Sequence, residues 1–237
     1  FPYFLNGNEN DNENNNDTPN DLSNDDVVNS ILKMWNSIVL CTPPTRIVFE
    51  HTSPNGVIMF KMAAILLTQF SIHINSIPKI EELPEPKIKG IKYMLLILQN
   101  LVSGMYVPFY AFNIYNDNIF TDLLNAIEAM INEPFVKLIE QYPKVFNQMI
   151  HFFREITVNQ IETVIETSSS LVKAILNCSI KLLTNGENDD ESIKKIYQWT
   201  LDIILAFLQH IYEFSLDYKP FQSQIDTINF LLWDKVL

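Results

Sequence analysis

Apolar residues recur along this chain at helical spacing and almost nowhere at the spacing of a strand. The clearest case is a row of apolar positions three or four residues apart, formed by Ile88, Ile91, Leu95, Leu98 and Val102. The polar residues of the same segment fall on its opposite side: Lys89, Lys92, Gln99 and Ser103. Because no segment keeps a period of two for long, the pattern predicts an all-α fold with helix in over roughly 60% of the residues.

The segment SPNG, residues 53 to 56, precedes one of the most apolar stretches of the chain. Its Asn-Gly pair fits a hairpin turn, but residues 57 to 74 never alternate and are too many for a strand. The pattern therefore predicts a mostly buried helix in which Ser53 is the N-cap and Pro54 the first helical residue. A narrow, weakly polar stripe on this helix is expected from Lys61, Ala64 and Thr68.

Capping signals and apolar periodicity predict further helices. The expected ranges are 25 to 40, 88 to 103 with Gly104 at the C′ position, 117 to 132 with Asp117 as the cap, and 143 to 155. Thr157 with Gln160 has the spacing of a capping box, and residues 167 to 170 should interrupt the helix that it opens. A long helix to about Phe214 should bury the row Tyr197, Leu201, Ile204, Leu208 and Ile211, and a last helix should follow Pro220.

The predicted helices form pairs whose lengths and short connections suit antiparallel packing. The pairs recur at roughly 40-residue spacing, which is typical of a HEAT-type α-solenoid. An irregular helical bundle is the alternative, because no residue-level repeat consensus is visible. We expect residues 25–237 to form HEAT-like repeats of a longer superhelix, because the chain begins without Met and ends within a helical pattern. Residues 1–24 should hold the end of a preceding helix and a disordered loop, since residues 6 to 21 are mostly Asn and Asp with scarcely an apolar side chain to bury.

The charge balance narrows the possible partners. The chain has 16 Lys and Arg against 28 Asp and Glu, a net charge of -12, which argues against binding nucleic acid or anionic membranes and favours basic proteins. Lys61, Lys92 and Asp202 should break the longest apolar runs before they reach the length of a membrane span. The two cysteines, Cys41 and Cys178, lie far apart and indicate a reducing compartment.

The sequence shows no residue pattern typical of a catalytic, cofactor-binding or metal-binding site. The histidines at 51, 73, 151 and 210 are expected to have no Cys, His or carboxylate partner at ligand spacing such as HxxxH or CxxC. Cys178 falls in an apolar row with Leu171 and Ile175. Asp189-Asp190-Glu191 stands where the first residues of a helix belong, so capping explains these acids better than a metal–diphosphate site. The sequence therefore predicts a protein that is not an enzyme and needs no cofactor.

One aromatic segment, residues 105 to 112, has more large rings than a connection between helices needs. Pro108 prevents a regular helix through it. Its rings either form a partner-docking surface or fill the seam between repeats, and filling the seam is the favoured interpretation. The weak candidates for partner binding are Tyr106, Phe109, Tyr110 and Phe112.

Three stretches together resemble one protein family. They are RIVFEHTSPNGVIMFK (46 to 61), KIKGIKYMLLILQNLVSGMYVPFYAFNIYNDN (87 to 118) and, more loosely, FSLDYKPFQSQIDTINFLLWDKV (214 to 236). They look like successive segments of the C-terminal part of the exportin-7 family, karyopherins of the importin-β superfamily. The SPNG helix start and the Leu-x-Ser-Gly-x-Tyr-Val-x-Phe connection carry most of this resemblance.

The resemblance implies a HEAT-repeat superhelix that binds protein cargo together with Ran-GTP and carries it through nuclear pores. It also implies that Ran binds mainly to N-terminal repeats, outside a C-terminal segment such as this one. The expected partners are then Ran-GTP, protein cargo and nuclear pore proteins, with shuttling between nucleus and cytoplasm and no membrane insertion. A HEAT-repeat scaffold of a phosphatase or vesicle-coat assembly is the alternative, since its composition would be the same.

Overall fold

The computed structural model describes residues 24–40, 54–104, 107–167, 169–185 and 191–214, and a few positions between 219 and 230. Helices account for most of these residues, and no strand occurs among them, so the all-α prediction is confirmed. The elements are α1 (Asn24–Val39), α2 (Pro54–Asn75), the short 3-10 helix η2 (Ile80–Glu82), α3 (Glu85–Ser103), α4 (Tyr110–Ile114), α5 (Ile119–Met130), α6 (Glu133–Glu140), α7 (Pro143–Thr167), α8 (Ser169–Asn185) and α9 (Glu191–Phe214).

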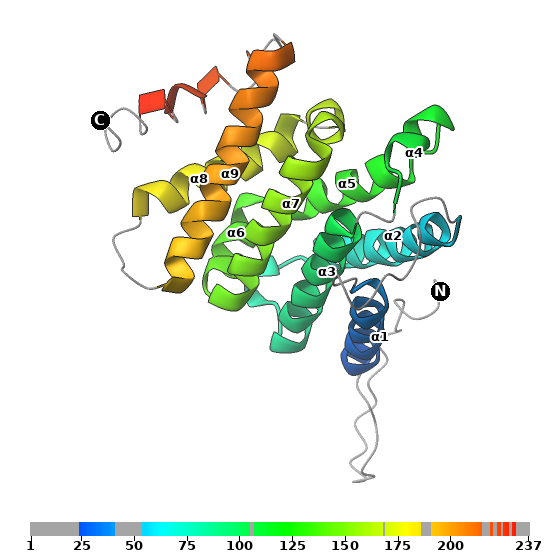
Figure 1. Cartoon of the computed structure of the whole chain (residues 1–237). Coiled ribbons are helices and arrows are strands. Elements are labelled where there is room, and N and C mark those ends of the chain that lie inside the picture. The colour runs from blue at the N-terminus through cyan, green and yellow to red at the C-terminus, as the bar shows by residue number, and fades with distance from the viewer. Residues whose placement is uncertain are drawn as a thin grey trace, which may run out of the picture.

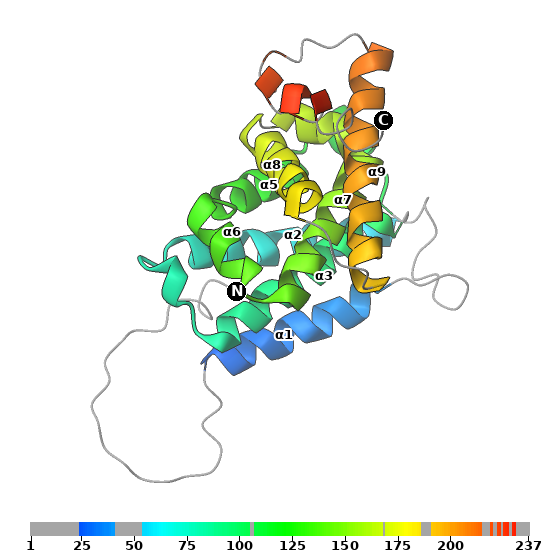
Figure 2. The ribbon, with the colours of Figure 1, turned by 90° about the vertical axis from the view of Figure 1, so that its left-hand side faces the viewer.

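The long helices alternate between two layers along the chain (Figures 1 and 2). One layer is a row in which α3 packs between α1 and α7, and α7 packs between α3 and α9. In the other layer α2 packs on α5, while α8 contacts α7 and α9. Successive helices of the row are rotated relative to one another, since α1 crosses the view of Figure 2 and α9 stands nearly upright. α7 therefore has a neighbour of the same row on each side.

Local signals set the starts of several helices as the sequence predicts. α2 begins at Pro54, while Ser53 lies outside the described residues. Asp117 accepts a hydrogen bond from the backbone N–H of Ile119 at 3.2 Å, so its side chain caps α5 although Asn118 occupies the N-cap position. Asn132 caps α6 in the same manner, because its Oδ1 accepts from the N–H of Phe135 at 2.9 Å.

Two predicted helix ends are wrong. Gly104 does not adopt the left-handed conformation of a C′ glycine, because its φ of -71° and ψ of -12° keep it right-handed. α7 does not end at Glu155 but continues to Thr167, with a kink at Gln160, whose φ is -141° and ψ 35°. The capping box does not form, since the Oγ1 of Thr157 is buried without a hydrogen-bond partner.

The buried face of α3 is the predicted one, but the buried face of α9 is not. All five apolar residues of the α3 row are buried. On α9 only Ile204 of the predicted row is buried, while Leu201 is 47% exposed and the other three, Tyr197, Leu208 and Ile211, are half-buried. The buried row of α9 is Ile196, Thr200, Ile203, Ile204 and Phe207. Apolar residues surround most of α9, so its periodicity alone does not decide which side meets α7.

α2 also differs from expectation. Its predicted polar stripe is wrong, because Ala64 is fully buried and the exposed face carries an apolar row instead. We call this row the α2 stripe: Ile58, Met62, Ile65 and Ile72, each 50 to 53% exposed. Lys61 does not shorten the apolar run below the length of a membrane span, since α2 is long and apolar enough to cross a membrane by length and composition. Nine of its residues are buried within the fold, as in a core helix.

The predicted extra helices and loops at the ends of the chain lie outside the described residues. This holds for residues 1–23, with the expected disordered loop, and for most of the segment after Pro220. The predicted interruption near residues 167 to 170 falls at residue 168, which lies outside the described residues, between α7 ending at Thr167 and α8 beginning at Ser169.

Candidate functional site

The aromatic segment after α3 lies mainly in the core. Phe109 and Phe112 are buried, and both pack against Phe60 of α2, with ring centroids 5.3 Å and 5.2 Å from it. Phe120 of α5 lies 4.7 Å from Phe109 and completes the group. These rings join the connection after α3 to the α2–α5 layer, the arrangement expected of rings that fill a seam.

Of the other two candidates in this segment, Tyr110 differs from its buried neighbours because it is 65% exposed. Tyr106 lies outside the described residues. Two further large apolar side chains on the same short stretch, Ile114 and Tyr115, are also exposed, by 66% and 80%. Tyr110 is therefore the one predicted candidate that the described structure leaves accessible to a partner.

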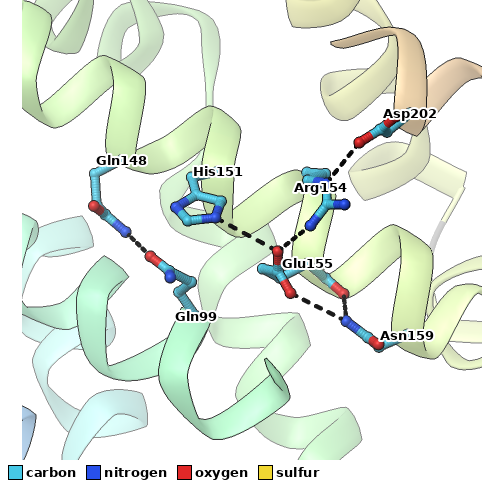
Figure 3. A network of polar contacts seen from close by, with 7 residues as sticks. All are labelled: Gln99, Gln148, His151, Arg154, Glu155, Asn159 and Asp202. Carbon is cyan, nitrogen blue, oxygen red and sulfur yellow. Dashed lines mark hydrogen bonds and ion pairs between the residues drawn. The ribbon is translucent and has the colours of Figure 1, made fainter. Parts of the chain in front are cut away.

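A row of polar side chains follows α7 where it passes between α3 and α9 (Figure 3). The row consists of Gln148, His151, Arg154, Glu155 and Asn159, three or four residues apart except for the neighbouring pair. Gln148 donates a hydrogen bond to Gln99 of α3, which ties the row to one neighbouring helix. Arg154 ties it to the other neighbour, since its Nε donates to Oδ2 of Asp202 on α9 at 2.8 Å.

Glu155 is the centre of this row and is only 7% exposed. Its carboxylate forms an ion pair with Arg154 and lies 3.5 Å from Nε2 of His151. The Nδ2 of Asn159 donates to the other carboxylate oxygen at 3.3 Å and to the backbone carbonyl of Glu155 at 2.8 Å. The hydrogen bond from His151 and the contact with Arg154 hold the pKa of Glu155 below its ordinary value, although burial opposes them.

His151 also contacts α9 through its ring. The imidazole lies parallel to the indole of Trp199, with ring centroids 4.1 Å apart and an angle of 2° between the planes. The Nζ of Lys195 lies 5.2 Å from the centroid of the same indole. One face of α9 therefore supplies an aromatic ring and a carboxylate to the polar row of α7, and Lys195 lies over that ring.

This arrangement is suited to holding helices together rather than to acid–base chemistry. A lowered pKa makes Glu155 a weak proton acceptor, and three neighbouring side chains already occupy its carboxylate. Arg154 is held in its charged form, because its hydrogen bonds to Asp202 and Glu155 outweigh the effect of burial and raise its pKa. The row links three helices of one layer, α3, α7 and α9.

Sequence reasoning missed this row. The His151–Glu155 pair has i, i+4 spacing, so the sequence did carry a local signal for it, contrary to the expectation that no histidine has a carboxylate at such a distance along the chain. No local signal links α7 to Asp202 or Trp199, which come from a separate helix about 48 residues further along.

The remaining histidines and cysteines do not gather into a site within the described ranges. His73 lies 3.4 Å from Nζ of Lys87, and burial, reinforced by that charge, lowers its pKa. Cys178 is buried, as predicted, and burial raises the pKa of its thiol to about 12. No group of three potential metal ligands occurs among the described residues, and His51 and Cys41 lie outside them.

Comparison with known proteins relates the chain to one group. It is 31% identical to Ran-binding protein 16 of Drosophila melanogaster over 204 residues, which cover 85% of this chain and 17% of that protein. It is 23% identical to human Ran-binding protein 17 over 201 residues, covering 78% of this chain and 18% of the relative. Exportin-7-B of Xenopus laevis is 23% identical over 175 residues, covering 67% of this chain and 16% of the relative.

The chain thus spans less than a fifth of the length of the curated relatives that it matches. No protein-family model matches it. No solved structure matches it either. The resemblance inferred from residues 46 to 61 and 87 to 118 is confirmed by these relatives and extends over most of the sequence: the chain is similar to the exportin-7 and Ran-binding protein 16/17 group of the importin-β family.

Proposed function

We propose that this chain is part of a nuclear transport receptor that binds protein cargo together with Ran in its GTP form and shuttles between nucleus and cytoplasm. The observation that carries the proposal is the sequence relationship to exportin-7 and two Ran-binding proteins over 67 to 85% of the chain. In this proposal the chain supplies part of a helical arch, is not an enzyme, and works by shape and charge complementarity.

The two-layer arrangement supports a HEAT-type solenoid. In such a superhelix each helix pair packs mainly on its neighbours, and the row α1, α3, α7 and α9 is built in that way. The rotation between α1 and α9 is consistent with the twist that a superhelix accumulates. This twist supports the solenoid over an irregular bundle, which has no need to alternate its helices between two layers.

The α2 stripe supports the same architecture. Four apolar side chains on one face of α2 are about half exposed, a spacing and chemistry typical of a helix that packs against another helix. Since the relatives are several times longer than this chain, we propose that a neighbouring helix pair of the same polypeptide covers the stripe in the whole protein. The stripe would then be an interface between repeats rather than a membrane-facing surface.

The charge of the chain fits protein cargo. With a net charge of -12 and no large cationic surface expected, its outer faces favour basic partners over nucleic acid. The contribution of such charges should weaken as added salt shortens the screening length from about 10 Å at 0.1 M to about 3 Å at 1 M. Tyr110, the exposed candidate of the aromatic segment, is proposed as a secondary contact with a partner.

A pulldown with Ran tests the proposal. The whole natural protein that contains this sequence should retain Ran loaded with GTP and not Ran loaded with GDP, whereas residues 1–237 alone should bind either form weakly. The reason is that the resemblance assigns the principal Ran contacts to N-terminal repeats. A whole protein indifferent to the nucleotide on Ran would contradict the transport receptor and would favour a HEAT-repeat scaffold of a phosphatase or vesicle-coat assembly.

A further inference from the structure

A pocket of about 610 Å³ lies where the first turns of three helices meet. α1 contributes Asp26 and Asn29, and α3 contributes its first residues from Glu85 onward. The third side is the connection between α6 and α7 together with the start of α7 at Pro143. No part of the polar row on α7 or of the aromatic segment lines this pocket.

Three lysines line the pocket: Lys89, Lys92 and Lys144. Lys89 and Lys92 are three residues apart on α3 and so lie on one face of that helix, and Lys144 faces the same pocket from α7. Within the described part of the chain, none of the three ammonium groups has an ion-pair or hydrogen-bond partner, whereas Lys61, Lys79, Lys87, Lys137 and Lys181 are all paired.

Two carboxylates line the same pocket, and both have a structural role. Asp26 and Glu85 stand in the first turns of α1 and α3, where a negative charge offsets the positive end of the helix dipole. The pocket therefore holds more positive than negative side chains, together with the starts of three helices. In a chain whose net charge is -12, this is a local reversal of sign.

The floor of the pocket is apolar. Ile88 and Val145 line it and are 3% and 5% exposed, and the half-buried ring of Tyr142 and the ring of Pro86 lie beside them. Asn29 is fixed in the wall, because its Nδ2 donates to the carbonyl oxygen of Pro86 at 2.9 Å. Such a lining offers contacts to an aliphatic or aromatic side chain, with lysines around it for carboxylates.

We infer that this pocket binds an acidic peptide segment of a partner protein, one that carries Asp or Glu residues on either side of an apolar anchor. Charge complementarity selects the acidic residues, and the apolar floor selects the anchor over a small anion. The inference stands on the pocket itself, so it does not depend on the transport function proposed above.

A fluorescein-labelled peptide of Glu and Asp residues around one Phe and one Leu tests the inference by fluorescence anisotropy with residues 1–237. The variant K89E/K144E reverses two exposed charges, one on each side of the pocket. The control K33E/K173E makes the same change in net charge at two exposed lysines outside it. We expect the first pair to weaken binding at least about tenfold and the control to change it less than about twofold.

Further comparisons test the inference. A peptide with Gln and Asn in place of Glu and Asp should bind at least about tenfold more weakly, and raising the salt should weaken the acidic peptide. Equal loss in both paired variants, or equal binding of the neutral peptide, would overturn the inference. So would displacement of the acidic peptide by inorganic phosphate at a similar concentration, because the apolar anchor would then contribute nothing. Circular dichroism of both variants separates lost binding from lost folding.

Discussion

The imidazole of His151 on α7 lies parallel to the indole of Trp199 on α9, with 4.1 Å between ring centroids. The same histidine contacts Glu155, while Arg154 next to Glu155 bonds Asp202 one helical turn beyond Trp199. The contact between α7 and α9 thus combines a ring stack with an ion-pair network, both formed by side chains that are half-buried or less exposed.

The ring stack should make a measurable contribution to stability. In a double-mutant cycle of His151→Ala and Trp199→Ala, the coupling free energy of unfolding should be about 0.5–1.5 kcal/mol, the range for stacked rings beyond their buried area. Urea denaturation of the four proteins gives this value. Trp199→Phe, which keeps an aromatic ring, should retain part of the coupling. A coupling near zero would show that the two rings only lie side by side.

Glu155 should make stability fall in acid. Its pKa in the folded protein is held below the ordinary value of 4.5, so the unfolded chain takes up the proton first as the pH decreases. Its contribution is therefore present above pH 4.5 and is lost as the pH falls through the folded pKa. Urea midpoints of Glu155→Gln between pH 3 and 7 should show a flatter decline than those of the natural chain. Glu162→Gln, an exposed position on the same helix, should keep the decline.

Gly90 should not accept a side chain. A Cβ at this position would lie 2.9 Å from Cζ of Phe70 on α2 and 3.0 Å from Oδ1 of Asn29 on α1, and both of these residues are buried. Gly90→Ala should therefore lower stability by about 1–3 kcal/mol, even though alanine is the better helix former. Thermal unfolding measures the loss. The double change Gly90→Ala/Phe70→Leu should recover part of it, and a stabilised single variant would show that α3 can move away.

The buried face of α3 predicts unequal losses of stability for two changes one helical turn apart. Leu95 is 1% exposed, so Leu95→Asp places a charge in the core and should cost more than about 4 kcal/mol or prevent folding. Lys92 is half-buried at the pocket, and Lys92→Asp should cost less than about 1 kcal/mol. Soluble yield and melting temperature compare the two. Similar losses would mean that the packing of α3 is not the one described.

Two substitutions in the aromatic segment should affect stability and partner binding separately. Phe109→Ala removes a buried ring that touches Phe60 and Phe120, and it should cost about 3–5 kcal/mol. Tyr110→Ala removes an exposed ring and should leave the melting temperature within a few degrees. If Tyr110 contacts a partner of the whole protein, its loss should weaken capture of that partner from cell extract. Unchanged capture would remove Tyr110 from the proposed contacts.

Local pattern was sufficient for the all-α class, for the starts of two helices and for one buried face. The starts of α2 and α5 and the buried row of α3 follow from caps, prolines and a period of 3.6 residues. Each of these signals acts within one or two helical turns, so neighbouring residues are enough to read it. On α3 the contrast between apolar and charged sides is strong, which leaves one choice of face.

Where contrast around a helix is weak, the neighbouring helices decided the outcome. Apolar residues lie on most sides of α9, and its buried row is the one that meets α7 and α8, with Thr200 inside and Leu201 outside. On α2 the packing of α5 and α3 buried Ala64 and left the α2 stripe exposed. The helical period gives the angle around the helix axis between successive residues, but it does not say which side of the helix faces the core.

The candidate sites depend on contacts between segments far apart in the sequence. Arg154 meets Asp202 across 48 residues, and the pocket joins Asp26 of α1 to Lys144 of α7. No spacing along the chain encodes such meetings, because the helices between them set the distance and direction in space. The sequence alone indicated an all-α chain that resembles the exportin-7 group. Which lysines stay unpaired among the described residues, and which carboxylate lies buried beside Arg154 and His151, followed only when the helices packed against one another.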